Sequence, residues 1–172
     1  MFETGTYIIC GQHGVCRVEA VGPIKLSEAS KNRIYYTLSQ VGTRDGVIYV
    51  PADSEKITMR QVINRQAAEN LIEGIDEIET LWIEHEKKRE ETFKNALRTC
   101  DYRDWVKVIK TIYQRKESRI LQGKKVTVSD ERYLHVAEEN LYGELAIALG
   151  MKKEEIEQYI IDKMKEKQEL NA

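Results

Sequence analysis

Three side chains near the amino terminus have the spacing of metal ligands. Cys10, His13 and Cys16 are separated from one another by two residues each. Zinc takes four ligands in a structural site, or three and a water molecule in a catalytic one. No second pair of ligands lies nearby in the sequence. We therefore expect His13 to be a turn residue and the cysteines to be small strand side chains, with no metal or other cofactor bound.

The sequence lacks the motifs of the common enzyme classes. It has no glycine-rich phosphate loop and no Gly-x-Ser-x-Gly nucleophile motif. His85 and Glu86 form the most suggestive His–carboxylate pair, but adjacent residues of a helix point in different directions. We therefore expect no catalytic residues, no small-molecule substrate and no enzymatic activity.

Positive charge is concentrated in one segment of a chain that is acidic elsewhere. The formal net charge is −2, yet residues 87–125 carry thirteen Lys and Arg against five Asp and Glu. A local excess of this size favours a polyanionic partner such as nucleic acid. The alternative is a solvated helical face whose charges are balanced in space by the acidic helices on either side.

The elements that must position these residues fall into two groups. Between Thr6 and Ile57 the pattern predicts short strands, rich in β-branched and aromatic residues and separated by Gly, Asp and Pro. The predicted strands are 7–10, 15–21, 33–38 and 46–50. The first two should form a hairpin, and Gly42–Gly46 should connect the last two. Short strands at this spacing suggest a small curled sheet or barrel.

After Pro51 the apolar residues recur with a period near 3.6, which predicts helices. The predicted helices are 59–77, 79–99, 101–122, 129–149 and 152–169. Asp101 and Ser129 are candidate N-caps, and Gly123 and Gly150 are candidate C-terminal stops. The sequence thus predicts an α+β protein, with a β domain at 1–57 and an all-α bundle of about five helices at 58–172.

Neither the composition nor the amino terminus indicates a membrane or secreted protein. No stretch approaches the roughly 20 apolar residues of a membrane span, and the first residues lack a basic region followed by an apolar run. Three cysteines cannot all pair within one chain. We expect a cytoplasmic protein with reduced thiols.

Several short motifs in the first 62 residues resemble the CarD family of bacterial transcription regulators. They are Phe2–Ile9, His13–Val18, Tyr35–Leu38, Val50-Pro51-Ala52 and Met59-Arg60-Gln61-Val62. Their order and spacing are also similar to those of the polymerase-binding module of transcription-repair coupling factors. The resemblance implies a Tudor-like or SH3-like β-barrel that binds RNA polymerase.

The helical half extends the resemblance to the CarD family. It has Trp82 and Arg89, then Asp101, and a later helix with Ala137 and the segment Glu144-Leu145-Ala146. A repair coupling factor would continue into a helicase, whereas this sequence ends at residue 172. The resemblance therefore favours a CarD-type regulator.

The resemblance implies a division of labour between the two domains. The barrel would add an edge strand to the polymerase β subunit, through Arg44, Ile48, Tyr49 and Val50. Tyr49 stands where family members carry Arg, but main-chain hydrogen bonds tolerate such a change. The helical domain would contact promoter DNA at the upstream edge of the melted region without reading its sequence, and so stabilise the open complex. The protein would then lie on the nucleoid through polymerase.

Trp82 is the candidate wedge for the minor groove, because it lies among polar residues at the start of a predicted helix. The candidate phosphate contacts are Lys87, Lys88, Arg89, Lys94, Lys124 and Lys125, with Arg103, Lys107 and Lys110 as a second group. Two alternatives remain open at this stage. Trp82 could cap the core, since Arg89, Phe93, Ala96 and Cys100 share its predicted helical face. The chain could also be a Tudor-like adaptor that binds a protein and no DNA. Trp105 is expected in the core.

Overall fold

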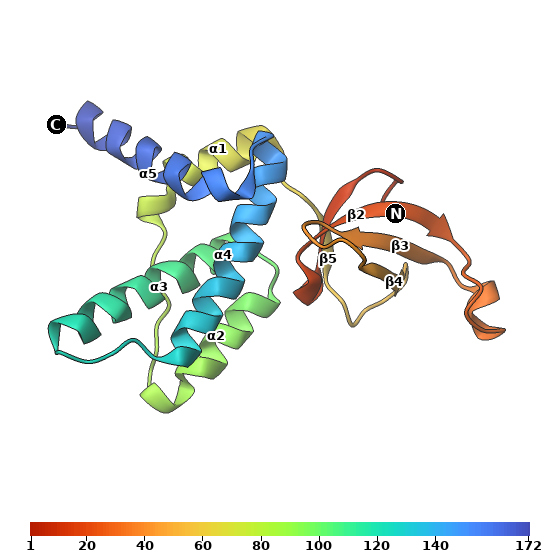
Figure 1. Ribbon diagram of the computed structural model, residues 1–172, viewed down its shortest axis with the longest axis horizontal. Helices are drawn as coiled ribbons and strands as arrows, with labels where there is room; N and C mark the ends of the chain where they lie inside the picture. The colour runs from red at the N-terminus through yellow and green to blue at the C-terminus, as the bar shows by residue number, and fades with distance from the viewer. The chain divides into compact units, whose positions relative to one another are not determined.

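The computed structural model describes all residues, 1–172, and divides into two compact units. The first unit is Met1–Val62 and the second is Ile63–Ala172. Figure 1 shows strands in the first unit and helices in the second. The first unit extends five residues past the expected boundary at 57, because a fifth strand at Met59–Gln61 belongs to its sheet.

The first unit is a five-stranded antiparallel sheet. The strands are β1 (Tyr7–Cys10), β2 (Val15–Gly22), β3 (Tyr35–Gln40), β4 (Val47–Pro51) and β5 (Met59–Gln61). Their order is β4-β3-β2-β1-β5, so the hairpins β1–β2 and β3–β4 are those that the sequence predicts. The sheet is not closed: β4 and β5 are its two edges. The expected barrel is therefore an open, curled sheet.

One face of this sheet carries the core of the unit. Alternation along β1, β2 and β3 turns every second side chain to that face. The buried set is Ile8, Cys10, Cys16, Val18, Tyr36, Leu38 and Val50. Phe2 covers its edge and contacts the ring of Tyr36. The β3–β4 register places Leu38 opposite Ile48 and Tyr36 opposite Val50.

The second unit contains five α-helices. They are α1 (Arg65–Glu73), α2 (Arg89–Arg98), α3 (Tyr102–Leu121), α4 (Val128–Leu149) and α5 (Lys153–Leu170). Helix α4 packs against each of the other four, and its buried residues recur every three or four positions along most of its length. Phe93, Trp105, Val108, Ile112 and Leu141 are among the buried core residues, so Trp105 lies in the core as expected.

Helix ends follow the sequence signals with one exception. Asp101 caps α3 by accepting a hydrogen bond from the Arg103 amide, and Gly150 ends α4 in the left-handed conformation. The N-cap of α4 is Thr127 rather than Ser129: its side chain accepts from the Asp130 amide.

Two predicted helices are much shorter than expected. The region 59–77 holds β5 and then α1, which begins after its N-cap Asn64. The region 79–99 begins with an irregular stretch and a short 3-10 turn at Glu86–Lys88, and α2 starts only at Arg89. Leu81 and Ile83 face the core while Trp82 and Glu84 face solvent, an alternation typical of extended chain. The structure contains no candidate membrane-spanning helix.

Candidate functional site

Strand β4 presents a free main-chain edge. In an antiparallel ladder, opposed residues alternate between hydrogen-bonded and non-hydrogen-bonded pairs. The Ala52 amide donates to the Ile34 carbonyl and the Gln40 amide donates to the Gly46 carbonyl, so residues 46, 48, 50 and 52 bond to β3. The amide and carbonyl groups of Val47 and Tyr49 consequently point away from the sheet, whereas the Pro51 carbonyl accepts from the Ser54 amide at 3.0 Å.

The side chains of β4 alternate between solvent and core. Val47 and Tyr49 are exposed, while Ile48 is half-buried against the core of the sheet. Val50 is 1% exposed, so its side chain cannot contact a partner, contrary to the expectation for this residue. Arg44 lies exposed in the β3–β4 turn. An added strand would thus meet Tyr49 and Val47 directly, and Val50 would contribute only support from within.

Trp82 projects into solvent. Its side chain is 84% exposed, although Leu81 and Ile83 on either side pack against the core cluster around Phe93. It does not lie on a helix, contrary to our prediction, because this stretch is extended. The alternative that Trp82 caps the core is therefore wrong. Tryptophan is highly buried on average in folded proteins, so an exposure of this size is unusual.

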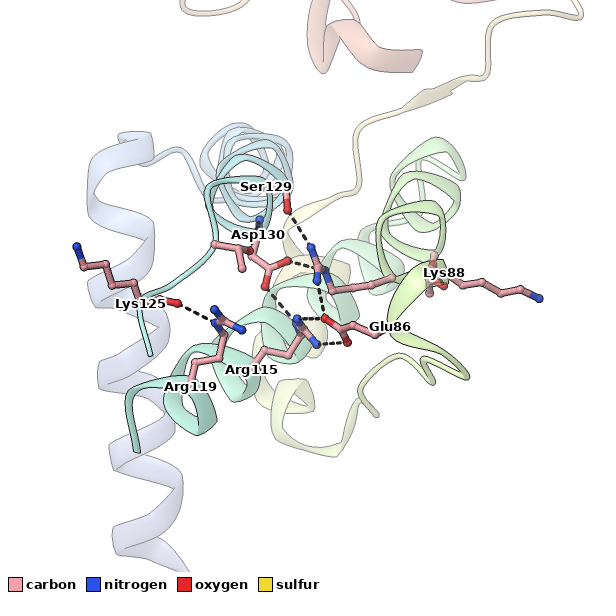
Figure 2. A network of polar contacts seen from close by, with 10 residues as sticks. Glu86, Lys88, Arg115, Arg119, Lys125, Ser129 and Asp130 are labelled. Carbon is pink, nitrogen blue, oxygen red and sulfur yellow. Dashed lines mark hydrogen bonds and ion pairs between the residues drawn. The ribbon is translucent and has the colours of Figure 1, made fainter. Parts of the chain in front are cut away.

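A buried carboxylate organises the region that follows Trp82. Asp130, in the first turn of α4, is fully buried. Its Oδ1 lies 3.0 Å from Nε of Arg89 at the start of α2, and its Oδ2 lies 3.1 Å from Nε of Arg115 in α3. Arg89 also donates to Ser129 Oγ at 2.9 Å. Figure 2 shows the two guanidinium groups meeting on this carboxylate.

Glu86 closes the same network from the 3-10 turn. One of its oxygens accepts from Arg89 at 2.5 Å and from Arg115 at 2.8 Å, and the other accepts from Arg115 at 3.2 Å. The hydrogen bonds from Arg115, and then those from Arg89, lower the pKa of the Glu86 carboxyl below its ordinary value. Two carboxylates thus neutralise two guanidinium groups and join α2, α3, α4 and the turn before α2.

Arg89 is therefore a structural residue and not a phosphate contact. Its side chain is 14% exposed, it forms an ion pair with Asp130, and it donates hydrogen bonds to Glu86 and Ser129. Arg89 falls on the helical face of Phe93 and Ala96, both buried, and this sequence signal marks it as inward-facing.

The thirteen basic side chains of residues 87–125 divide into three groups. Those paired with carboxylates are Lys88, Arg89, Lys107, Arg115 and Lys116. Lys110 and Arg119 donate to main-chain carbonyls. The six with no ion pair are Lys87, Lys94, Arg98, Arg103, Lys124 and Lys125. The six residues with no ion pair therefore keep an uncompensated positive charge in the folded protein, whereas nearby carboxylates neutralise the five paired ones.

The exposed lysines nearest to the network flank it. Lys124 and Lys125 lie exposed in the α3–α4 loop, where Arg119 Nε donates to the Lys125 carbonyl at 2.8 Å. Lys87 and Lys88 lie exposed in the 3-10 turn, and the nearest carboxylate to Lys88 is Glu84 at 3.8 Å. In Figure 2, Lys88 and Lys125 point outward on opposite sides of the network. Lys94 is exposed on α2.

The second group of candidate phosphate contacts is less available. Lys110 donates to the main-chain carbonyls of Ile75, Asp76 and Ile78, so its ammonium is fully engaged. Lys107 lies 3.7 Å from Asp104. Arg103 remains exposed and, with Lys107, lines a hollow of about 600 Å³ beside α1. Lys110 is therefore not available to bind a phosphate group.

The cysteines of the Cys10-x2-His13-x2-Cys16 pattern lie in the sheet core. Both are fully buried, and a hydrogen bond links their thiols. This bond and then burial raise the pKa of Cys16, which keeps it a neutral thiol. His13 lies in the short turn between β1 and β2, where its carbonyl accepts from Gln40. The structure gathers no group of three or more His, Cys, Asp or Glu side chains that could hold a metal ion.

Comparison with known families identifies the sheet unit. Residues 2–63 match the CarD-like/TRCF RID domain. A comparison with curated proteins found no match. The matched residues contain all five strands, including the edge strand β4, and they end where the helical unit begins. The sheet unit is therefore similar to the CarD-like/TRCF RID domain, which is an RNA polymerase-interacting domain.

Proposed function

We propose that this protein is a non-catalytic regulator that binds the β subunit of RNA polymerase and stabilises the promoter open complex. The sheet unit docks through the free edge of β4. The helical unit contacts DNA at the upstream edge of the melted region, with Trp82 as an aromatic wedge and exposed lysines on the phosphates. The protein is thereby associated with the nucleoid of a bacterial cytoplasm.

The polymerase half of the proposal is supported by the family match and by the geometry of β4. An edge strand with outward amide and carbonyl groups can accept a strand from another protein. Val47 and Tyr49 supply these groups and also the exposed side chains beside them. Because main-chain bonds carry the pairing, Tyr49 is compatible with the docking that the family implies.

The DNA half is supported by one observation above the others: Trp82 is 84% exposed between two aliphatic residues that face the core. An aromatic ring presented in this way can stack on an opened base step or wedge into a widened minor groove. Lys87, Lys88, Lys124 and Lys125 are exposed side chains that can bind phosphates. Of these, Lys88 and Lys125 point outward on opposite sides of the Asp130 network (Figure 2). Such contacts need no base-reading element, so promoter deformability would set the response.

The test is the lifetime of open complexes on a reconstituted promoter with and without the full-length protein. The wild-type protein should lengthen the lifetime. Trp82→Ala should remove at least about fivefold of that gain, the equivalent of roughly 1 kcal/mol of stacking. Trp82→Phe, which keeps a smaller ring, should fall between the two. An unchanged lifetime in Trp82→Ala would exclude Trp82 from the mechanism.

The second candidate function is a protein-binding adaptor that does not touch DNA. It is favoured by the five basic side chains that carboxylates already neutralise. The two candidates differ in one measurement: an adaptor would show no salt-sensitive binding to a forked duplex, whereas the open-complex stabiliser would.

A further inference from the structure

Three side chains of α3 hold the segment that carries Trp82. The first is Lys110, whose Nζ donates to the carbonyls of Ile75 at 3.1 Å and Asp76 at 3.2 Å, and also to that of Ile78. An ammonium group has three donors. The three carbonyls therefore use all of them and fix the chain just before Trp82.

The second side chain is Thr111. Its Oγ1 accepts from the amide of Leu81 at 2.8 Å and donates to the Lys107 carbonyl at 2.7 Å, which orients the hydroxyl. Thr111 is buried, so this bond to the residue next to Trp82 is protected from water.

The third side chain is Arg115, one helical turn further along α3. It pairs with Glu86 beyond Trp82 and is itself held by the buried Asp130. The segment 75–86 is thus tied to α3 before, beside and after Trp82. Leu81 and Ile83 add apolar packing against the Phe93 cluster. Trp82 alone among residues 81–83 points outward.

We propose that Lys110 is a positioning residue which, with Thr111 and Arg115, holds the segment 75–86 so that Trp82 is presented rigidly to the partner. This inference rests on the proposed function insofar as the partner is DNA. A loop that had to order itself on binding would lose conformational entropy at that step, whereas a segment ordered in advance does not. The charge of Lys110 suggests a phosphate contact in the sequence, but in the structure its ammonium holds the segment that presents the Trp82 ring.

The first test follows Trp82 in the free full-length protein. Labelling with 5-fluorotryptophan gives one fluorine resonance for Trp82 and one for the buried Trp105, assigned through Trp82→Phe. Lys110→Met should shift or broaden the Trp82 resonance and leave that of Trp105 in place. Lys110→Arg, which retains donors, should restore most of the wild-type signal. The matched control is Lys116→Met, which removes an α3 ammonium that pairs with Glu131 on α4 instead.

The second test is a double-mutant cycle on open-complex lifetime. Lys110→Met should shorten the lifetime severalfold when Trp82 is present and should have no further effect in the Trp82→Ala background. An equal loss in both backgrounds would mean that Lys110 acts by another route, and an unchanged Trp82 resonance in Lys110→Met would also overturn the proposal. If Lys110→Met does not fold, Thr111→Val, which removes the bond to the Leu81 amide together with the bond to the Lys107 carbonyl within α3, decides by the same criteria.

The two proposals can fail separately. A Trp82 resonance that responds as expected, together with a lifetime that is insensitive to Trp82→Ala, would leave the positioning role of Lys110 intact and would contradict the DNA function. Conversely, an unchanged Trp82 resonance in Lys110→Met, together with a shortened open-complex lifetime in Trp82→Ala, would contradict the positioning role of Lys110 and leave the DNA function intact.

Discussion

Asp130 and Arg89 form an ion pair in the interior of the helical unit, with 3.0 Å between Oδ1 and Nε. The carboxylate is fully buried, and Arg115 binds its other oxygen. Removing one member of a buried pair leaves the remaining charge without compensation, which costs more than the pair contributes when intact. The starts of α2 and α4 meet α3 here, so Asp130 should control the stability of the whole unit.

Asp130→Asn should lower the free energy of unfolding of the helical unit by roughly 3 kcal/mol, because two guanidinium groups lose their buried partner. The measurement is urea unfolding followed by tryptophan fluorescence, since both tryptophans lie in this unit. Glu131→Gln, at the next position, removes the pair with Lys116 and should cost less than about 1 kcal/mol. Equal losses in the two variants would contradict the central place of Asp130.

Glu86 should make the helical unit less stable in acid. Its pKa is lowered in the folded protein, chiefly by Arg115, from an ordinary value of 4.5. The stabilisation it provides is therefore present above pH 4.5 and is lost as the pH falls through the lower folded value. Glu86→Gln should show a smaller difference between the free energies of unfolding at pH 7 and pH 3.5 than the wild type. The same difference in both proteins would refute this linkage.

Proline on β4 should separate folding from polymerase binding. Tyr49→Pro removes an amide that points away from the sheet, so the β3–β4 ladder keeps its hydrogen bonds. We expect a folded protein whose affinity for the polymerase β subunit falls at least about tenfold, the effect of about 1.4 kcal/mol of lost main-chain bonding. Affinity is measured with the full-length protein.

Two comparison variants make the β4 experiment specific. Tyr49→Ala keeps the amide and should bind more tightly than Tyr49→Pro. Ile48→Pro removes an amide directed at β3 and should destabilise the sheet unit itself. If Tyr49→Pro bound as well as Tyr49→Ala, strand addition at β4 would be excluded.

The lysines of the α3–α4 loop should contribute to DNA affinity without regard to sequence. Changing Lys124 and Lys125 to Glu should weaken binding to different forked duplexes by similar factors. It should also reduce the slope of log K against log salt by about 2, one unit for each lost phosphate contact. Lys163→Glu with Lys165→Glu on α5 is the charge-matched control and should leave the slope unchanged. A slope unaffected by the loop variant would remove these lysines from the interface.

Local sequence patterns predicted the elements that have strong local signals. The alternation in 7–10 and 15–21 and the cap at Asp101 lie close to the observed bounds. Strand β5 was missed because Met59-Arg60-Gln61 has no β-branched residue and becomes a strand only by pairing with β1. The stretch before α2 was predicted as helix because Ile78, Leu81 and Trp82 fit a period of 3.6. In the structure, the inward-facing Leu81 and Ile83 alternate with the exposed Trp82 and Glu84, which is the period of extended chain.

The candidate site was only partly accessible to sequence reasoning. Trp82 and the candidate lysines were predicted from their positions in the sequence and from the resemblance to the CarD family. The roles of Arg89 and Lys110 depend on Asp130 and on the carbonyls of Ile75, Asp76 and Ile78, which lie 32 to 41 positions away along the chain. Charge in the sequence cannot distinguish a guanidinium that meets a distant carboxylate from one that meets solvent.

Pro51 limits the length of a strand that can pair with the edge of β4. It has no amide, and its carbonyl already accepts from the Ser54 amide at 3.0 Å, so a strand laid along β4 finds main-chain partners at Val47 and Tyr49 and none at Pro51, where the pairing must stop. A guest strand would therefore form only a few main-chain hydrogen bonds along β4, and would have few to break on leaving. Such a docking suits a factor that exchanges between enzyme molecules rather than a permanent subunit.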